Sequence, residues 1–365
     1  MKFQTDKTTL LKGTQVVQNI VSTKGVFPIL SNILLETKKD KLHLIGADID
    51  IGIAIQSIIP INTQDEGSIT IPAKKFSEII KELPNAQISI SVKKNNIMTI
   101  ECEKCHFKLL GMPKDEFPKI PDFSKKEGVV FEQSKLKHML NLTSFAMSRD
   151  ETRYELNSIL FDIQEDKIRL VATDGRRLAM IEEKIQTPKE FIKQLIIPNK
   201  TVQELNRILA DEGEVKILFG ENQIAFELDS TTITTRLIDG EYPPYEQVMP
   251  KDEKFKLRVN KEALSAAIKR MSLYITQDSL CVKFDLFKNK LVLSKNTQDL
   301  GEAKEELEVI YADKEFTIGF NPIFILDVLK ELKKDEVVFE ITDSEKPAVI
   351  REPGYVYIVL PMHIA

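Results

Sequence analysis

The chain has 365 residues, of which 42% are hydrophobic and 29% are charged, and its formal net charge at pH 7 is −5. This composition is typical of folded domains and excludes a chain that is disordered or collagen-like throughout. A single hydrophobic core rarely serves so long a chain, so we expect two or three domains. The negative charge excludes a protein that is basic all over, but it permits one local basic surface.

The sequence contains no segment that predicts secretion or membrane insertion. The first ten residues lack the apolar core of a signal peptide. The most apolar stretch, residues 51–61, contains polar residues and Pro60 and is too short to span a bilayer. Three cysteines cannot form a complete disulfide framework. We therefore expect a cytoplasmic protein with no membrane partner.

Two separate motifs indicate that the chain repeats one plan three times. Strands that run into a helix are predicted at residues 71–83, 197–209 and 320–332. Alternating strands are predicted at residues 41–44, 167–170 and 290–293, with the same two spacings between copies. Each copy is far longer than solenoid repeats of about 20 to 50 residues and has the size of a domain.

Each repeat is predicted to contain the same elements in the same order. A short first strand is expected at residues 2–5, 129–132 and 256–259. An amphipathic helix follows, with one apolar face that includes Leu10 and Val17 in the first copy. Alternating strands come next, and then a second helix with Pro in its first turn, where the missing N–H is tolerated.

Turn residues and proline-rich joins complete the plan. Turns between the closing strands are predicted at residues 95–96, 220–222 and 343–344. Proline-rich stretches at 113–121 and 243–250 mark the joins between copies. The sequence therefore predicts an α+β protein with domains at residues 1–125, 126–251 and 252–365.

Positive charge is concentrated around the first helix of every repeat. Residues 7–35 and 133–149 contain Lys or Arg but no acidic residue, and residues 256–277 contain Glu262 as their only acid. Such a surface suits a polyanion that is bound through its phosphates without reading of bases. The alternative is that these lysines merely solvate exposed helix faces. Because three equivalent helices share the feature, we favour the polyanion.

One motif suggests redox or haem chemistry. Residues 102–106 fit the C-x-x-C-H pattern of covalent haem attachment. The two residues between the cysteines align with Ser230-Thr231, which we interpret as a hairpin turn. We therefore interpret Cys102 and Cys105 as strand residues that flank a turn, with metal binding or redox pairing as alternatives.

No other motif predicts catalysis. The four histidines form no metal-ligand spacing, and Asp48-Ile49-Asp50 is interpreted as a turn that caps itself. The chain contains no nucleophile elbow, no phosphate-binding loop and no dinucleotide fingerprint. We expect no enzymatic activity, no cofactor and no metal site.

Several motifs, spread over the whole chain, resemble those of the bacterial DNA sliding clamps, the beta subunits of DNA polymerase III. They are Thr173-Asp174-Gly175-Arg176-Arg177-Leu178-Ala179 and the segments 27–32, 71–74, 239–243, 319–321, 326–329 and 359–362. The resemblance implies three similar domains of the α+β DNA-clamp fold, in a ring-shaped head-to-tail dimer with helices lining the pore and sheets outside. It also implies a non-catalytic processivity factor that encircles duplex DNA, slides along it and tethers the replicative polymerase.

The resemblance, together with the basic helices, leads us to expect three sets of functional residues. The expected DNA-binding residues are Lys12, Lys24, Lys74, Lys137, Arg149, Arg153, Tyr154, Lys200, Lys269 and Arg270. The expected walls of a peptide pocket between the second and third domains are Arg153, Leu156, Thr173, Gly175, Arg176, Arg177, Leu178, Pro243, Val248, Val359, Leu360, Pro361 and Met362. The expected dimer contacts are Phe107, Leu273 and Tyr274.

The pocket is expected to be an apolar slot with cationic groups at its rim. The implied partners are double-stranded DNA of any sequence, a second copy of the chain, the polymerase alpha subunit, the clamp loader delta subunit and other proteins with a clamp-binding motif. Gln247, Pro347 and His363 depart from residues common in the family, which leaves the preferred peptide open. A protein-interaction scaffold with no DNA role is the alternative function.

Overall fold

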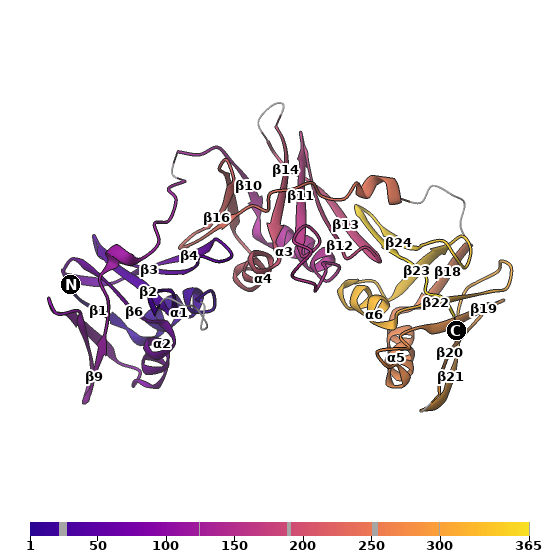
Figure 1. The fold of residues 1–365 in the computed structure, drawn as a ribbon, viewed down its shortest axis with the longest axis horizontal. Helices are drawn as coiled ribbons and strands as arrows, with labels where there is room; N and C mark the ends of the chain where they lie inside the picture. The colour runs from indigo at the N-terminus through magenta and orange to yellow at the C-terminus, as the bar shows by residue number, and fades with distance from the viewer. Residues whose placement is uncertain (22–27, 124, 188–190, 250–254, 299, 365) are drawn as a thin grey trace. The chain divides into compact units, whose positions relative to one another are not determined.

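The computed structural model describes residues 1–21, 28–123, 125–187, 191–249, 255–298 and 300–364. The chain packs as two compact units, one made of residues 1–136 and 203–237 and the other of residues 137–202 and 238–365. Figure 1 shows that each unit combines antiparallel sheets with short helices. The middle repeat thus contributes to both units, and the three predicted domain boundaries stay a prediction.

The first repeat contains two helices among its described strands. Its elements are β1 (Lys2–Asp6), α1 (Lys7–Gln18), β2 (Asn32–Lys38), β3 (Lys41–Asp48), β4 (Ile53–Pro60), β5 (Asn62–Asp65), β6 (Gly67–Pro72), α2 (Ala73–Glu82), β7 (Gln87–Val92), β8 (Ile97–Cys102) and β9 (Cys105–Leu110). Helix α1 begins after Asp6, whose carboxylate accepts a hydrogen bond from the backbone N–H of Thr9 at 2.8 Å. This side-chain cap satisfies one of the free N–H groups of the first turn.

The second and third repeats share one order of strands and helices, which is that of the first repeat without β5. The second contains β10 (Gly128–Glu132), α3 (Gln133–Ser144), β11 (Ser158–Gln164), β12 (Lys167–Thr173), β13 (Arg177–Lys184), β14 (Ile192–Pro198), α4 (Asn199–Ile208), β15 (Glu214–Phe219), β16 (Gln223–Leu228) and β17 (Thr231–Arg236). The third contains β18 (Phe255–Asn260), α5 (Lys261–Met271), the 3-10 turn η4 (Ser272–Tyr274), β19 (Val282–Phe287), β20 (Lys290–Thr297), β21 (Gly301–Glu308), β22 (Phe316–Phe320), α6 (Pro322–Glu331), β23 (Glu336–Ile341), β24 (Ala348–Glu352) and β25 (Tyr355–Val359).

The apolar helix faces that the sequence predicted are buried. Leu10 and Val17 of α1, Leu136 and Met139 of α3, and Leu264 of α5 have almost no exposed surface. In Figure 1, α1 lies beside α2 and α5 lies beside α6, and these pairs are in contact. Burial of these faces against the sheets supplies the hydrophobic stabilisation of each repeat.

Strand pairing joins consecutive repeats into continuous sheets. One sheet has the order β10-β15-β16-β17-β4-β3-β2-β6, so β17 of the second repeat pairs with β4 of the first. Another has the order β14-β11-β12-β13-β25-β24-β23-β18, so β13 of the second repeat pairs with β25 of the third. The remaining described strands form the sheets β5-β1-β7-β8-β9 and β21-β20-β19-β22.

The two joins have the same register. The hairpin registers make Ile233 of β17 equivalent to Tyr357 of β25, because they lie opposite Phe226 and Ile350 in matching hairpins. Ile233 is paired with Ile55, and Tyr357 is paired with Ala179. The latter two residues are themselves equivalent, since they lie opposite Gly46 and Ala172. One rule of strand pairing therefore serves both joins.

Two details of the predicted turns and caps differ from the structure. Pro322 lies in the first turn of α6 as predicted, but Pro72 and Pro198 are the last residues of β6 and β14. These two prolines directly precede α2 and α4, one residue earlier than predicted, because each strand stays paired through its proline, opposite Asn32 and Ser158 respectively.

The hairpin between β16 and β17 turns one residue earlier than predicted. The turn consists of Asp229 and Ser230, and Thr231 already pairs with Leu228. The prediction that Cys102 and Cys105 flank a turn is confirmed, because the two residues lie directly opposite each other across Glu103 and Lys104. Both thiols are free.

The described residues contain no group of three or more His, Cys, Asp or Glu side chains arranged to hold a metal ion. The Asp48 carboxylate accepts hydrogen bonds from the backbone N–H groups of Asp50 and Ile51, which is the capping role predicted for it. Among the described helices, none has the length and hydropathy needed to cross a membrane.

Candidate functional site

An apolar pocket of about 440 Å³ opens inside the second compact unit, where the second repeat meets the third. One wall is the turn that leads into β13, a second is the segment 243–248, and a third is the end of β25. Of the predicted pocket residues, the structure brings together Leu156, Thr173, Gly175, Arg176, Arg177, Leu178, Pro243, Val248 and Leu360.

Four predicted pocket residues do not line this cavity. Arg153 is exposed, with its Nε 3.7 Å from a carboxylate oxygen of Asp150. Val359 is buried in the core. Pro361 and Met362 lie beyond the pocket, where the backbone N–H of Met362 donates to the carbonyl oxygen of Gly319 at 2.8 Å.

Other residues line the pocket that the sequence did not indicate. They are Pro244, Tyr245, Gln247, Pro347 and Ile358. Ile358 could have been found, because side chains two residues apart on a strand share a face. If Leu360 lines the pocket, Ile358 is expected to line it too, and the side chain of Val359 is expected to point toward the core. Gln247 and Pro347, which were expected to differ from the residues common in the family, both line the pocket.

The turn before β13 is held in place by its own side chains. The Asp174 carboxylate accepts from the backbone N–H groups of Arg176 and Arg177, at 2.8 and 3.0 Å. The Thr173 hydroxyl donates to the carbonyl oxygen of Arg177 at 2.6 Å. Gly175 has a φ of +86°, a conformation that residues with a Cβ rarely adopt. This wall is therefore rigid before any ligand binds.

Arg177 is a structural residue and not a cation at the rim. Its side chain is buried, with residue exposure of 4%. Its guanidinium contacts Asp174 at 3.1 Å and Asp327 at 2.7 Å, and it donates to the carbonyl oxygen of Phe145 at 2.6 Å. The Phe324 ring lies 4.4 Å from the guanidinium carbon. The prediction of cations at the rim is thus wrong for Arg177, whereas Arg176 is exposed.

Tyr245 fixes the segment that forms the second wall. Its hydroxyl donates to a carboxylate oxygen of the buried Asp162 at 2.8 Å. Burial, together with this hydrogen bond, raises the pKa of Tyr245 to about 12. Arg169 lies 4.0 Å from Asp162 and donates to Glu182 at 2.7 Å. A buried network thus ties the pocket wall to β11 and β12.

The predicted DNA-binding residues lie on or near the helices. Lys12 of α1, Lys74 of α2 and Lys269 of α5 are exposed, and Lys137 of α3 and Lys200 of α4 are half-buried. Arg149, Arg153 and Tyr154, in the segment after α3, are exposed. Lys24 lies outside the described residues. Arg270 of α5 forms an ion pair with Glu305 at 2.5 Å. The carboxylate of Glu305 partly offsets the positive charge that Arg270 would present to DNA.

Two of the three predicted dimer residues, Phe107 and Leu273, are apolar and exposed in the single chain. Phe107 of β9 is 39% exposed, and Leu273 of η4 is 76% exposed. Tyr274 is half-buried, and its carbonyl oxygen accepts a hydrogen bond from the Thr297 hydroxyl. Large apolar side chains of this kind at a sheet edge commonly mark an interaction site.

Sequence comparisons identify the family. The models of the DNA polymerase III beta subunit match in three parts: the N-terminal domain at residues 1–121, the central domain at 130–244 and the C-terminal domain at 246–363. The chain belongs to the DNA polymerase III beta subunit family. The predicted resemblance to the bacterial sliding clamps is confirmed, and a member of this family is a non-catalytic subunit.

Full-length relatives support the same assignment. The beta sliding clamp of Chlamydia pneumoniae is 33% identical over 365 residues, covering 100% of this chain and 99% of its own. That of Pseudomonas putida is 33% identical over 371 residues, with both chains covered completely.

Solved structures of DNA polymerase III beta subunits share the fold. The sliding clamp of Bacillus subtilis superposes with a TM-score of 0.95 at 30% identity and 100% coverage of both chains. A Pseudomonas aeruginosa sliding clamp bound to griselimycin gives a TM-score of 0.95 at 31% identity, again over 100% of both chains. The predicted α+β clamp fold with three similar domains is confirmed.

Proposed function

We propose that two copies of this chain close head to tail into a ring around duplex DNA, and that the ring tethers DNA polymerase III through the apolar pocket. Family membership supports the sliding-clamp role. The observation that carries the proposal is the pair of strand edges left open at the two ends of the repeat array, β9 and β21.

The internal joins supply a template for closure. Strand β9 is the last strand of its repeat, like β17 and β25, and β21 is equivalent to β4 and β13. In the described residues β9 and β21 each have a partner on one side only, whereas their equivalents are paired on both sides. Open edges of this kind readily pair with a second chain, and closing the ring satisfies them.

Applied to the open edges, the shared register predicts specific pairs between subunits. Phe107 would lie opposite Ala303 of the partner subunit, as Ile233 and Tyr357 lie opposite Ile55 and Ala179. Burial supports this pairing, since Ile233 and Tyr357 are 0% exposed but Phe107 is 39% exposed. Pairing with a second chain would bury its remaining surface.

The position of Leu273 fits the same template. Leu273 follows the first helix of the third repeat at the position that Phe145 has in the second repeat. The Phe145 ring contacts the Tyr357 ring at 5.7 Å between centroids. Because Phe107 is equivalent to Tyr357, the equivalent contact in a ring would join Phe107 to Leu273 of the partner subunit. Tyr274, the next residue, would border it.

The exposed lysines on the helices would supply loose contacts to DNA. Lys12, Lys74 and Lys269 form no ion pair with any residue that the structure describes, and each belongs to a helix of the first or third repeat. Lysines that meet phosphates without base contacts bind every sequence similarly, which permits sliding. Lys24, Lys137, Arg149, Arg153, Tyr154, Lys200 and Arg270 complete the proposed set.

The pocket would bind short motifs with Leu and Phe anchors. Leu178, Val248, Ile358 and Leu360 present apolar surface for such side chains. The proposed partners are the polymerase alpha subunit, the clamp loader delta subunit and other proteins with the motif, all in the cytoplasm. One pocket on each subunit would allow partners to exchange on a loaded ring.

The closure is tested with Phe107→Ala combined with Leu273→Ala. Truncating a buried aromatic anchor costs about 2–4 kcal/mol at an interface, so the dimer should dissociate at least about tenfold more readily. Sedimentation velocity over a range of concentrations measures this change. Ile192→Ala, at an exposed residue of β14, is the control that should leave the dimer intact. A double variant that dimerises as tightly as the wild type would contradict the proposed interface.

A further inference from the structure

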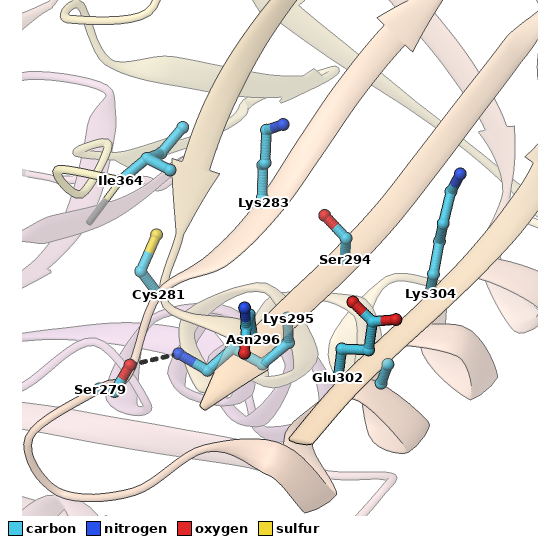
Figure 2. Close-up of a pocket in the computed structure, with 10 residues that line it drawn as sticks. Ser279, Cys281, Lys283, Ser294, Lys295, Asn296, Glu302, Lys304 and Ile364 are labelled. Atoms are coloured by element: carbon cyan, nitrogen blue, oxygen red, sulfur yellow. Dashed lines mark hydrogen bonds between the residues drawn. The ribbon is translucent and has the colours of Figure 1, made fainter. Parts of the chain in front are cut away.

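A second pocket, of about 270 Å³, lies on the sheet β21-β20-β19-β22 of the third repeat (Figure 2). Lys283, Ser294 and Lys304 lie directly opposite one another on three neighbouring strands, so their side chains share one face of the sheet. Figure 2 shows the three side chains pointing in the same direction. Lys295, at the lower end of the view, donates a hydrogen bond to Ser279.

The same sheet row is apolar in the second repeat. The register makes Leu160 equivalent to Lys283, Val171 to Ser294 and Met180 to Lys304. Leu160 and Val171 form one hydrophobic cluster with Tyr245, and Met180 and Tyr242 pack against that cluster. Tyr242 and Tyr245 belong to the segment that leads into the third repeat. In the second repeat, therefore, an extended stretch of the chain itself covers this face.

The first repeat shows the same cover. Leu34 and Ile45 of the equivalent row pack with Phe117 and Met112, which follow the last strand of that repeat. The segment that follows the last strand begins with an equivalent backbone hydrogen bond in all three repeats. The backbone N–H groups of Met112, Ile238 and Met362 donate to the carbonyl oxygens of Thr70, Ile196 and Gly319, at 2.9, 2.9 and 2.8 Å respectively. In the third repeat Ile364 reaches the pocket, and beyond it no described residue covers the row.

Two of the three residues in the uncovered row are lysines, and the pocket lining contains three lysines and one acidic residue. Lys283 is 3.0 Å from Asp285, whereas Lys304 has no ion-pair partner among the described residues. Glu302 is the acidic residue in the pocket wall. If the ring forms as proposed above, the shared register places Lys108 of the partner subunit opposite Glu302. That pairing, which rests on the proposed function, would offset the negative charge of Glu302.

We propose that this lysine row binds an extended acidic peptide of a partner protein, along the path that the chain's own linkers follow in the first two repeats. Strands lie about 4.8 Å apart, so the lysines on β19 and β21 are separated by about 10 Å at the backbone. Flexible lysine side chains can reach two carboxylates of one extended peptide over this distance. Cys281, which shares the face of Lys283, and Ile364 line the same pocket and offer apolar surface to one small aliphatic side chain of the peptide.

The probe is a fluorescently labelled, acetylated heptapeptide, Gly-Asp-Leu-Asp-Ile-Asp-Gly, and its matched control carries Asn at each Asp. Binding to the full-length protein is followed by anisotropy at fixed ionic strength. Because charge-assisted contacts dominate, the double variant Lys283→Met and Lys304→Met should bind the acidic probe at least about fivefold more weakly. Lys288→Met, in the exposed turn between β19 and β20, should bind it like the wild type.

Three outcomes would overturn the proposal. They are the absence of saturable binding by the wild type, equal affinity in the double variant, which would assign the binding to other basic surfaces, and equal binding of the Asn peptide. Inorganic phosphate that displaces the probe at equal concentration would indicate a small-anion site instead. The double variant should still dimerise and bind a Leu-Phe peptide, so failure of this proposal is distinguishable from failure of the proposed function.

Discussion

The guanidinium of Arg177 lies 2.7 Å from the carboxylate of Asp327, so an ion pair between a buried arginine and a half-buried aspartate joins the start of β13 to helix α6 of the third repeat. Arg177 also forms part of the pocket wall. The pocket is therefore built on a charge pair between two repeats. Breaking a buried pair on one side leaves an uncompensated charge, which is strongly destabilising.

Asp327→Asn should lower the stability of the protein and weaken peptide binding together. The substitution keeps the side-chain volume but leaves Arg177 with Asp174 as its ionised partner. We expect a loss of about 1–3 kcal/mol in unfolding free energy, measured as a lower thermal midpoint. Arg176→Ala, at the exposed neighbouring residue, should leave the midpoint unchanged. An unaltered midpoint in Asp327→Asn would contradict the structural role of the pair.

Leu360→Ala should weaken binding of a Leu-Phe motif peptide without unfolding the pocket. Leu360 is 41% exposed, so its truncation removes ligand contact more than core packing. Burying a Leu side chain contributes about 1.5–3 kcal/mol, and loss of half of this is a roughly three- to tenfold fall in affinity. Calorimetric titration measures the change, with Ile192→Ala as the control. Unchanged affinity would show that the peptide binds elsewhere.

Tyr245→Phe should test how the pocket wall is positioned. The variant keeps the ring but removes the hydrogen bond to Asp162. The net value of such a bond is about 1 kcal/mol, so we expect a several-fold loss of peptide affinity with the dimer unaffected. Tyr242→Phe removes a hydrogen bond to a backbone carbonyl in the same segment and serves as the comparison. Equal peptide binding by Tyr245→Phe and the wild type would show that Asp162 does not position the wall.

The raised pKa of Tyr245 predicts the pH range of this effect. A group whose folded pKa lies above its unfolded value contributes stability that is fully present below the unfolded pKa, near 10, and is lost as the pH rises through the folded pKa, about 12. Peptide affinity should therefore not change through ionisation of Tyr245 between about pH 7 and 9. A wild-type decline in this range that Tyr245→Phe abolishes would contradict the raised pKa.

A charge exchange should test the register of the proposed ring. Lys108→Glu or Glu302→Lys alone would place like charges opposite each other between subunits and weaken the dimer. Combining both substitutions should restore it, since opposite charges on facing strands stabilise by about 0.2–1 kcal/mol. Sedimentation equilibrium measures the dissociation constants, and Lys94→Glu, in an exposed turn, is the control. Weakening by the single variants without rescue in the double variant would indicate a different register.

Much of the fold was predictable because the same pattern of strands and helices occurs three times in the sequence. The repeated spacing of strands and helices identifies the plan, and the buried faces of α1, α3 and α5 match the predicted apolar positions. Local strand register was harder to predict. The turn before Thr231 and the extended Pro72 and Pro198 depend on how far each strand stays paired, which is decided by its neighbours and not by the local sequence.

The pocket was predictable in outline but not in its chemistry. Motifs located the wall from Thr173 to Leu178, yet nothing local to Arg177 indicates that Asp327, far along the chain, holds it in the interior. The role of Tyr245 also depends on a distant partner, Asp162. Long-range partners of charged and hydroxyl groups are set by packing between repeats, so they appear only in the folded structure.

The central claim, that the chain encircles DNA, is tested most directly by retention on nicked circular DNA. The protein is loaded, free protein is removed by gel filtration at moderate salt, and half of the sample is cut with a restriction enzyme. If the ring encircles DNA, the protein should stay with the intact circle and be lost from the linear product through its ends, while Phe107→Ala with Leu273→Ala should be retained on neither. Equal retention on circular and linear DNA would contradict encirclement and would indicate ordinary electrostatic binding.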